Sequence, residues 1–459
     1  MQSMSTAQDA IEKRRIYMTT TPINQLMPRL AVPSMISMLV TNFYNMVDTF
    51  FVGQISTQAT AAVGVVLPLM SIMQAFGFFC GHGSGNFISM RLGSRKIDEA
   101  KTQAANGFFL AFGLGILLAV FGLTRVTWLA TRLGATPTIV DDTISYMAVI
   151  LIGAPFTTSQ FVINNQLRFE GSATYAMVGL VTGAVINIAL DPILMFGFGM
   201  GVRGAAVATV ASQIISWTIL LIGTSRGPNI RIDIRNVKFN YYYLSHIFKG
   251  GFPSLARQGL NSVSVIIMNH IAGTIGGDAA IAAMSIVGRF MMLCLSALIG
   301  FGHGLQPVCT FNYGAGKYSR LREARKFCIK YGTVFMACIS LVMFLFAPHI
   351  IAFFRDDPDV IAIGTKALRF LSISFPFAAY SMMNSMICQA LNRSFRATIL
   401  STARSGLFYI PALYFLTKYL GLTGLEMSQM TAGLCTFLIT IPIMITVMRE
   451  IPTEDRLEQ

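Results

Sequence analysis

Residues 103–124, QAANGFFLAFGLGILLAVFGLT, decide the fold because they contain no Asp, Glu, Lys or Arg. Coiled as an α-helix at about 1.5 Å per residue, a run of this length spans about 30 Å, the thickness of a bilayer's hydrocarbon core. Similar runs recur along the 459-residue chain, which is 54% hydrophobic and 12% charged, with a mean hydropathy of +0.62. Soluble globular domains carry roughly 25% charged residues. The sequence therefore predicts an all-α polytopic membrane protein and disfavours a soluble protein with long core helices.

Polar breaks divide the apolar sequence into twelve expected transmembrane helices. Their expected positions are 27–52, 58–90, 103–124, 143–166, 174–197, 203–224, 250–273, 279–309, 327–347, 360–389, 397–418 and 425–448. The longest polar stretch, 225–249, is rich in Arg and Lys and separates the sixth expected helix from the seventh. We therefore expect an N-terminal six-helix bundle over 1–224, a cytoplasmic linker over 225–249 and a C-terminal six-helix bundle over 250–459.

The formal net charge of +14 is distributed unevenly over the breaks. Most Lys and Arg residues lie in every second break, on the side that also holds both termini, and this is the positive-inside pattern of membrane proteins. The first 25 residues lack the apolar core of a secretory signal. We therefore expect a multi-pass protein of the plasma (bacterial inner) membrane with both termini cytoplasmic, and the basic charge does not indicate nucleic-acid binding.

The two halves repeat each other at an offset of 221 residues. Gly81-His82-Gly83 matches Gly302-His303-Gly304, and Pro155-Phe156 matches Pro376-Phe377, without a gap between these positions. This pattern indicates a duplication. Because each half has an even number of helices, both halves enter the membrane in the same direction, as in transporters built from parallel repeats. In such transporters the substrate lies between the halves, which expose it alternately to the two sides of the membrane.

Two carboxylates, Asp48 and Asp191, lie well inside apolar runs. An Asp at the centre of a membrane helix costs about 2.5–3.5 kcal/mol on insertion scales, so a functional role is the default interpretation. Asn187 precedes Asp191 by four residues and shares its helix face. Asn42 and Asn45 are further polar residues near Asp48.

This cluster suits either a hard cation or a proton. Carboxylate and amide oxygens are ligands for hard cations, and Pro192 leaves a nearby backbone carbonyl unpaired that would add another. A buried carboxyl can equally take up and release a proton. The structural alternative is a hydrogen bond between helices that only holds the bundle together. The position matching Asp48 in the second half is Asn269, so we expect ion coupling in the first half alone.

Other polar residues in the apolar runs carry weaker signals. His82 and His303 are flanked by glycines in both halves, which favours helix packing over catalysis or proton relay. Arg257 and Arg289 would either neutralise an anionic ligand or extend to the membrane surface. Some of the 27 Met and 35 Phe residues would suit a plastic site for flat apolar cations. The seven cysteines form no CxxC or His-Cys pattern and predict neither a disulfide framework nor a metal site.

The stretch from Gly183 to Ser212 reads GAVINIALDPILMFGFGMGVRGAAVATVAS. It resembles the fifth and sixth helices of the multidrug and toxic compound extrusion (MATE) family. Further similar signatures cover nearly the whole chain; they are Val47-Asp48-Thr49, Asn312-Tyr313-Gly314-Ala315-Gly316 and Gln389-Ala390-Leu391. The resemblance implies twelve helices in two six-helix bundles that form a V, and expulsion of organic cations and drugs in exchange for H⁺ or Na⁺.

The resemblance also implies an ion site. In the DinF-like branch of the family, the first bundle holds the ion with a helix-one Asp, a helix-five Asn and Asp, and a helix-six Thr. The matching positions are Asp48, Asn187, Asp191 and Thr209, which would bind either H⁺ or Na⁺. The NorM-like branch adds carboxylates in helices seven and ten, where this chain has Asn261 and no central acid. The chain therefore resembles the DinF-like branch more closely than the NorM-like branch.

Together these observations predict a secondary active antiporter and not an enzyme. It would export amphipathic organic cations in exchange for H⁺ or Na⁺ by alternating access, as a monomer in the lipid bilayer, with no cofactor besides the coupling ion. The residues expected in the substrate cleft are Asn42, Asn45, Asn261, Arg257 and Arg289. The alternative is a lipid-linked oligosaccharide flippase of the same superfamily, which would need several cationic residues to hold a pyrophosphate. An intramembrane enzyme using a histidine lacks any Ser-His, HExxH or paired-Asp arrangement.

Overall fold

The computed structural model describes residues 2–456, which fold almost entirely as helices and contain no strand. The helices of the first half of the chain are α1 (Gln2–Thr20), α2 (Ile23–Ile55), α3 (Thr57–Gly93), α4 (Ile97–Thr124), α5 (Val126–Arg132), α6 (Val140–Phe169), α7 (Ala173–Pro192) and α8 (Gly201–Thr224). Those of the second half are α9 (Tyr241–Gly314), α10 (Tyr318–Phe354), α11 (Pro358–Ala390), α12 (Ser394–Thr402), α13 (Tyr409–Leu420) and α14 (Leu422–Glu450). Turns of π-helix extend α7 over Ile193–Gly197 and join α12 to α13 over Ala403–Leu407.

Eleven candidate membrane spans, long and apolar enough to cross a bilayer, are present within residues 2–456. One of them, α9, has 74 residues, several times the roughly 20 that a spanning helix needs. Its helical path is interrupted at Gly277, whose φ of 61° and ψ of −154° belong to a conformation that favours glycine. The expected helices 250–273 and 279–309 lie on either side of this interruption. Within the expected linker 225–249, the helix α9 begins at Tyr241.

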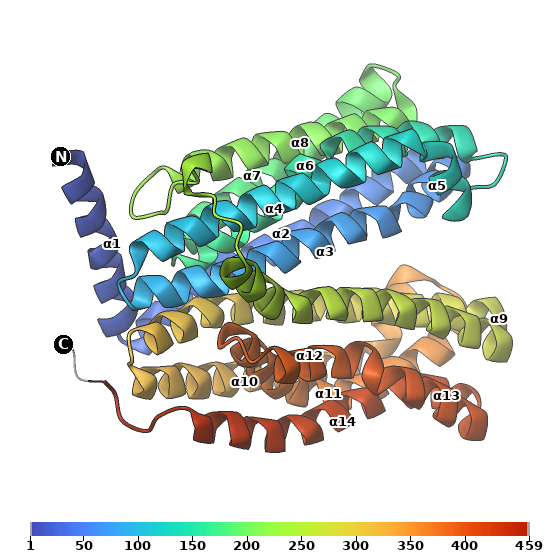
Figure 1. Ribbon diagram of the computed structural model, residues 1–459. Helices are drawn as coiled ribbons and strands as arrows, with labels where there is room; N and C mark the ends of the chain where they lie inside the picture. The colour runs from blue at the N-terminus through green and yellow to red at the C-terminus, as the bar shows by residue number, and fades with distance from the viewer. Residues whose placement is uncertain (1, 457–459) are drawn as a thin grey trace.

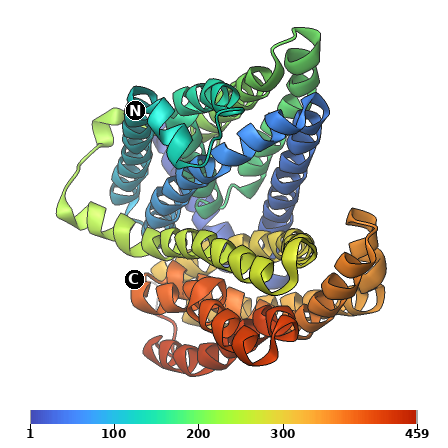
Figure 2. The same ribbon diagram turned by 90° about the vertical axis from the view of Figure 1, so that its right-hand side faces the viewer.

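The helices form two groups that correspond to the two halves of the chain. Figure 1 shows both termini at the same end of the molecule, and the two groups diverge toward the opposite end. Viewed from that opposite end, the blue-to-green helices lie on one side and the yellow-to-red helices on the other (Figure 2). The start of α2 crosses this division, because Ile23, Leu26 and Leu30 belong to the same buried apolar cluster as the core of the second half.

The contact between the two groups is reciprocal near the end that holds the termini. A Cβ on Gly93 would lie 2.3 Å from the carbonyl oxygen of Phe311, and a Cβ on Gly314 would lie 2.1 Å from that of Met90. The 221-residue offset relates the two contacts to each other, because Gly93 matches Gly314 and Met90 matches Phe311. The Thr310 hydroxyl donates to the Ser89 hydroxyl at 2.5 Å, and these two residues also match. Contacts that pair equivalent positions of two copies in this reciprocal way are typical of a two-fold symmetric interface.

Two histidines and an arginine are buried in the same contact. His82 and His303 are 1% and 4% exposed, and their ring centroids lie 5.5 Å apart. Arg168, from α6, bonds the Nδ1 of His303 at 2.5 Å and donates to Asn165 at 2.6 Å. The three side chains therefore connect α3, α6 and α9 where the halves meet.

The segment between α8 and α9 is attached to the first half. The Asn106 side chain donates to the Lys238 carbonyl and accepts from its N–H, both at 2.9 Å. Eight residues earlier, the Ile230 N–H donates to the Glu170 carboxyl at 2.8 Å. Burial raises the pKa of Glu170 to about 8, against the opposing effects of this hydrogen bond and of Arg14.

A Glu170→Gln variant should therefore be more stable than the parent protein at alkaline pH. The unfolded chain loses the Glu170 proton near pH 4.5 and the folded chain near pH 8, so the carboxyl's ionisation destabilises the fold progressively over that window. Glutamine keeps an acceptor for Ile230 but does not ionise. We expect the melting temperatures of the two purified proteins to coincide at pH 4.5 and the variant to be several degrees higher at pH 8.5. Parallel pH profiles for the two proteins would contradict this role of Glu170.

Candidate functional site

The four expected ion-site residues come from three neighbouring helices of the first half. Asp48 lies on α2, Asn187 and Asp191 lie at the end of α7, and Thr209 lies on α8. The three helices contact one another pairwise. The end of α7 is irregular because Pro192 has no N–H to donate to the preceding turn, and a π-helical turn follows it.

The polar side chains at this place are buried and rich in unused acceptors. Asp191, Asn187 and Thr209 are 0%, 2% and 5% exposed, and Asn187 donates to Asp191 Oδ1 at 3.2 Å. Among the described residues, no donor reaches Asp191 Oδ2, Asn187 Oδ1 or Asp48 Oδ1. Asp48 and Asp191 are close enough to interact electrostatically. Buried oxygens without donors are unfavourable, so the arrangement favours binding of a cation or a proton.

A small cavity adjoins these side chains. It is lined from α2, α6, α7 and α8, includes Asn187, Thr209 and Tyr44 in its wall, and has a volume of about 30 Å³. At roughly 10–15 Å³ for each water centre, it holds only a few water-sized occupants. Its size suits an inorganic ion with its water, and it is far too small for a drug molecule.

The five expected cleft residues differ in exposure and in their bonding partners. Asn42 donates to the Ser296 hydroxyl at 2.6 Å and so connects α2 to α9. Asn45, Asn261 and Arg289 are exposed, and Arg257 is half-buried and acts electrostatically on the two histidines. Within residues 2–456 no hydrogen bond or ion pair joins any two of the five.

Sequence reasoning missed three residues, of which Tyr146 and Glu426 are buried and Tyr44 is half-buried. Tyr44 and Tyr146 lie beside Asp48 and Asp191, but an aromatic residue in an apolar run gives no signal of its own. Glu426 is the second residue of the expected segment 425–448, and at this helix edge an acid gives no signal of burial. It is in fact 2% exposed on α14, its Oε2 has no donor in the described chain, and Lys366 supplies the opposite charge. The second half therefore contains a buried acid of its own.

The family assignment rests on two matched segments. The MatE family model matches residues 33–193 and 253–415, most of both halves. The chain belongs to the MatE family. The first matched segment contains Asp48, Asn187 and Asp191, whereas Thr209 lies between the two segments.

Curated proteins and solved structures of MATE transporters agree with this assignment. Multidrug export protein MepA of Staphylococcus haemolyticus is 27% identical over 432 residues, covering 93% of this chain and 94% of that protein. A crystal structure of a MATE protein in complex with MaL6 matches with a TM-score of 0.88 and 26% identity, over 95% of this chain and 99% of that one. An outward-facing multidrug resistance MATE family transporter matches with the same TM-score and identity, over 95% and 100%.

Proposed function

We propose that this chain exports amphipathic organic cations from a bacterial cell in exchange for H⁺ or Na⁺. Membership of the MatE family and similarity to multidrug export proteins support transport rather than catalysis, and support it over oligosaccharide flipping. The observation that carries the coupling mechanism is the set of unpaired buried oxygens on Asp48, Asn187 and Asp191. The cation or proton that they bind is the coupling ion, which is exchanged for the exported organic cation.

The fold supplies a connection from this site to the movement of the halves. Asp48 is on α2, and the beginning of the same helix packs against the second half, where Ala31 and Met35 leave room only for glycine at positions 304 and 300. Binding a cation or proton removes the repulsion between Asp48 and Asp191 and lets α2 and α7 pack together. A change in the position of α2 then alters its contact with α9. Ion release and substrate capture are thereby mutually dependent.

We further propose that Gly277 divides α9 into two spans, which gives twelve spans in two six-helix bundles. The reciprocal contacts at the 221-residue offset support this duplication. The bundles would comprise residues 1–224 and 250–459, with the termini and the connecting segment in the cytoplasm, in agreement with the basic breaks in the sequence. The match of Asp48, Asn187, Asp191 and Thr209 supports a place in the DinF-like branch.

Export from proteoliposomes tests the proposal. The purified protein is reconstituted into liposomes that contain an ethidium-like dye, and H⁺ and Na⁺ gradients are imposed separately. We expect dye movement several-fold above that of protein-free liposomes under at least one gradient and none above it without a gradient. Equal movement with and without gradients, or no movement under either, would overturn the antiport assignment.

A further inference from the structure

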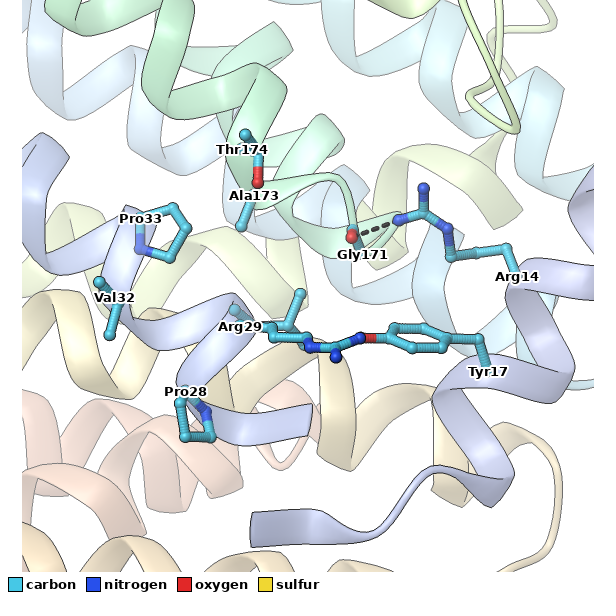
Figure 3. Close-up of a pocket in the computed structure, with 10 residues that line it drawn as sticks. Arg14, Tyr17, Pro28, Arg29, Val32, Pro33, Gly171, Ala173 and Thr174 are labelled. Atoms are coloured by element: carbon cyan, nitrogen blue, oxygen red, sulfur yellow. Dashed lines mark hydrogen bonds between the residues drawn. The ribbon is translucent and has the colours of Figure 1, made fainter. Parts of the chain in front are cut away.

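A second cleft lies outside the proposed ion site, where α1 meets the start of α2 and the turn between α6 and α7. Figure 3 shows its walls: Arg14 and Tyr17 come from α1, Arg29 and Val32 from α2, and Thr174 from the start of α7. Its volume is about 700 Å³, many times that of the cavity beside Asn187. Its lining residues come from α1 and the start of α2, and α1 lies at the end of the molecule that holds both termini (Figure 1).

The position of α1 beside the cleft is fixed by contacts of Arg15 and Glu12 with the end of α3 and the residues that follow it. Arg15 donates to the Gly93 carbonyl at 2.9 Å, and Glu12 pairs with Arg95 at 2.9 Å. These contacts attach α1 to the end of α3. Arg14 and Tyr17, three residues apart and therefore on one face, both point into the cleft (Figure 3).

Both arginines in the cleft keep donors for a ligand. Arg14 donates to the Gly171 carbonyl, and Arg29 donates to the Tyr17 hydroxyl at 3.2 Å. In the described part of the chain neither guanidinium forms an ion pair with a carboxylate. Glu170 is the carboxyl that interacts electrostatically with Arg14. Because burial raises the pKa of Glu170 to about 8, this carboxyl is mostly neutral at pH 7 and leaves the positive charge of Arg14 available to a ligand.

The start of α7 adds to the positive potential of this cleft. Ala173 and Thr174, its first residues, form part of the wall. No side chain caps the N–H groups of this 20-residue helix, and the Ser172 hydroxyl before it donates to Asn229. Uncapped N–H groups and the helix dipole attract anions, and phosphate oxygens in particular.

Apolar surface leads away from the charged part of the cleft. Val32, in its wall, is 49% exposed, and Ile36, one turn further along α2, is 40% exposed. On α7, which packs against α2, Val178 and Val185 are 46% and 59% exposed. Tyr175 is half-exposed at the level of the cleft, a position typical of aromatic residues at a membrane surface. A free phosphate would not contact these apolar side chains, whereas the acyl chain of a lipid would cover them.

We propose that this cleft binds an anionic phospholipid, with its phosphate between Arg14 and Arg29 and an acyl chain along the exposed apolar residues of α2 and α7. Basic clefts between membrane helices near the cytoplasmic surface are suited to such headgroups. The bound lipid joins α1, α2 and α7, and so stabilises the corner of the first half from which α2 begins.

Lipid-dependent melting of the detergent-purified full chain tests this site. The added ligands are phosphatidylglycerol, phosphatidylcholine with the same acyl chains, and soluble glycerol 3-phosphate. We expect phosphatidylglycerol to raise the melting temperature at concentrations where the other two do not. In an Arg14→Gln/Arg29→Gln variant, the phosphatidylglycerol concentration for half of the shift should rise by about fivefold for each arginine removed. The matched control is Arg125→Gln, an exposed arginine after α4, which should respond like the parent protein.

Each other outcome would overturn the proposal. An unchanged phosphatidylglycerol response in the double variant would place the lipid elsewhere, and equal stabilisation by glycerol 3-phosphate would identify a site for free phosphate esters. Lack of preference for phosphatidylglycerol in the parent protein would exclude a selective site. If the double variant does not fold, Arg29→Gln alone, which removes an exposed side chain, is compared by native mass spectrometry. The variant should retain fewer phosphatidylglycerol molecules than the parent, and equal retention would contradict the site.

Discussion

Ion-driven export is expected to fall to the level of protein-free liposomes when Asp48 or Asp191 is replaced by asparagine. Asparagine preserves the size of each side chain but removes the carboxylate that binds a cation or accepts a proton. At position 191 it still accepts the hydrogen bond from Asn187, so the fold should survive. Dye export under H⁺ and Na⁺ gradients measures the effect, and the melting temperature of each variant shows that folding is intact.

A matched control separates loss of the ion site from loss of charge in general. Asp141 is an exposed acid in the first turn of α6, and Asp141→Asn should export dye at the parent rate. Parent-like export by both Asp48→Asn and Asp191→Asn would contradict the assigned coupling site. Loss in only one of them would restrict coupling to that carboxyl.

Alanine at Gly93 or Gly314 is expected to disrupt the contact between the halves. A Cβ at either position would lie 2.1–2.3 Å from a backbone carbonyl oxygen, which no side-chain rotation can relieve. Overpacking of this kind typically costs about 1–3 kcal/mol, and here it acts specifically on the state in which this end is closed. We therefore expect dye export to fall at least about tenfold and the melting temperature to drop.

Gly288→Ala is the control for this prediction. A Cβ at Gly288, also on α9, meets no atom within 4 Å, so this substitution should leave export and stability near those of the parent. If Gly314→Ala and Gly288→Ala behave alike, the reciprocal contact does not limit the transport cycle.

The membrane-spanning helices were largely predictable from the sequence because a bilayer demands long apolar runs. Helical segments without such a run, namely α1 and the start of α9, were not predicted from the sequence. Polar α1 was missed because its position depends on distant pairs such as Glu12 with Arg95. The start of α9 had a local signal, since the Asn240 side chain accepts from the Tyr243 N–H as a helix cap, but the aromatic run beside it was interpreted as linker.

The candidate site shows a similar division. Asp48 and Asp191 stand out because acids are rare in apolar helices, and the structure brings Asn187 and Thr209 to the same three-helix region. The expected cleft residues stay a prediction, because exposure toward a central cleft depends on how the two halves meet. Burial of Glu426 likewise depends on packing against neighbouring helices, which its position near a polar break does not reveal.

Simultaneous measurement of ion uptake and dye efflux in the same proteoliposomes tests the coupling site most directly. In the parent protein, outward movement of dye should drive H⁺ or Na⁺ uptake in a constant ratio. In the Asp48→Asn/Asp191→Asn double variant, the dye should drive no ion movement. Ion uptake in the parent ratio by the double variant would show that the coupling ion binds elsewhere.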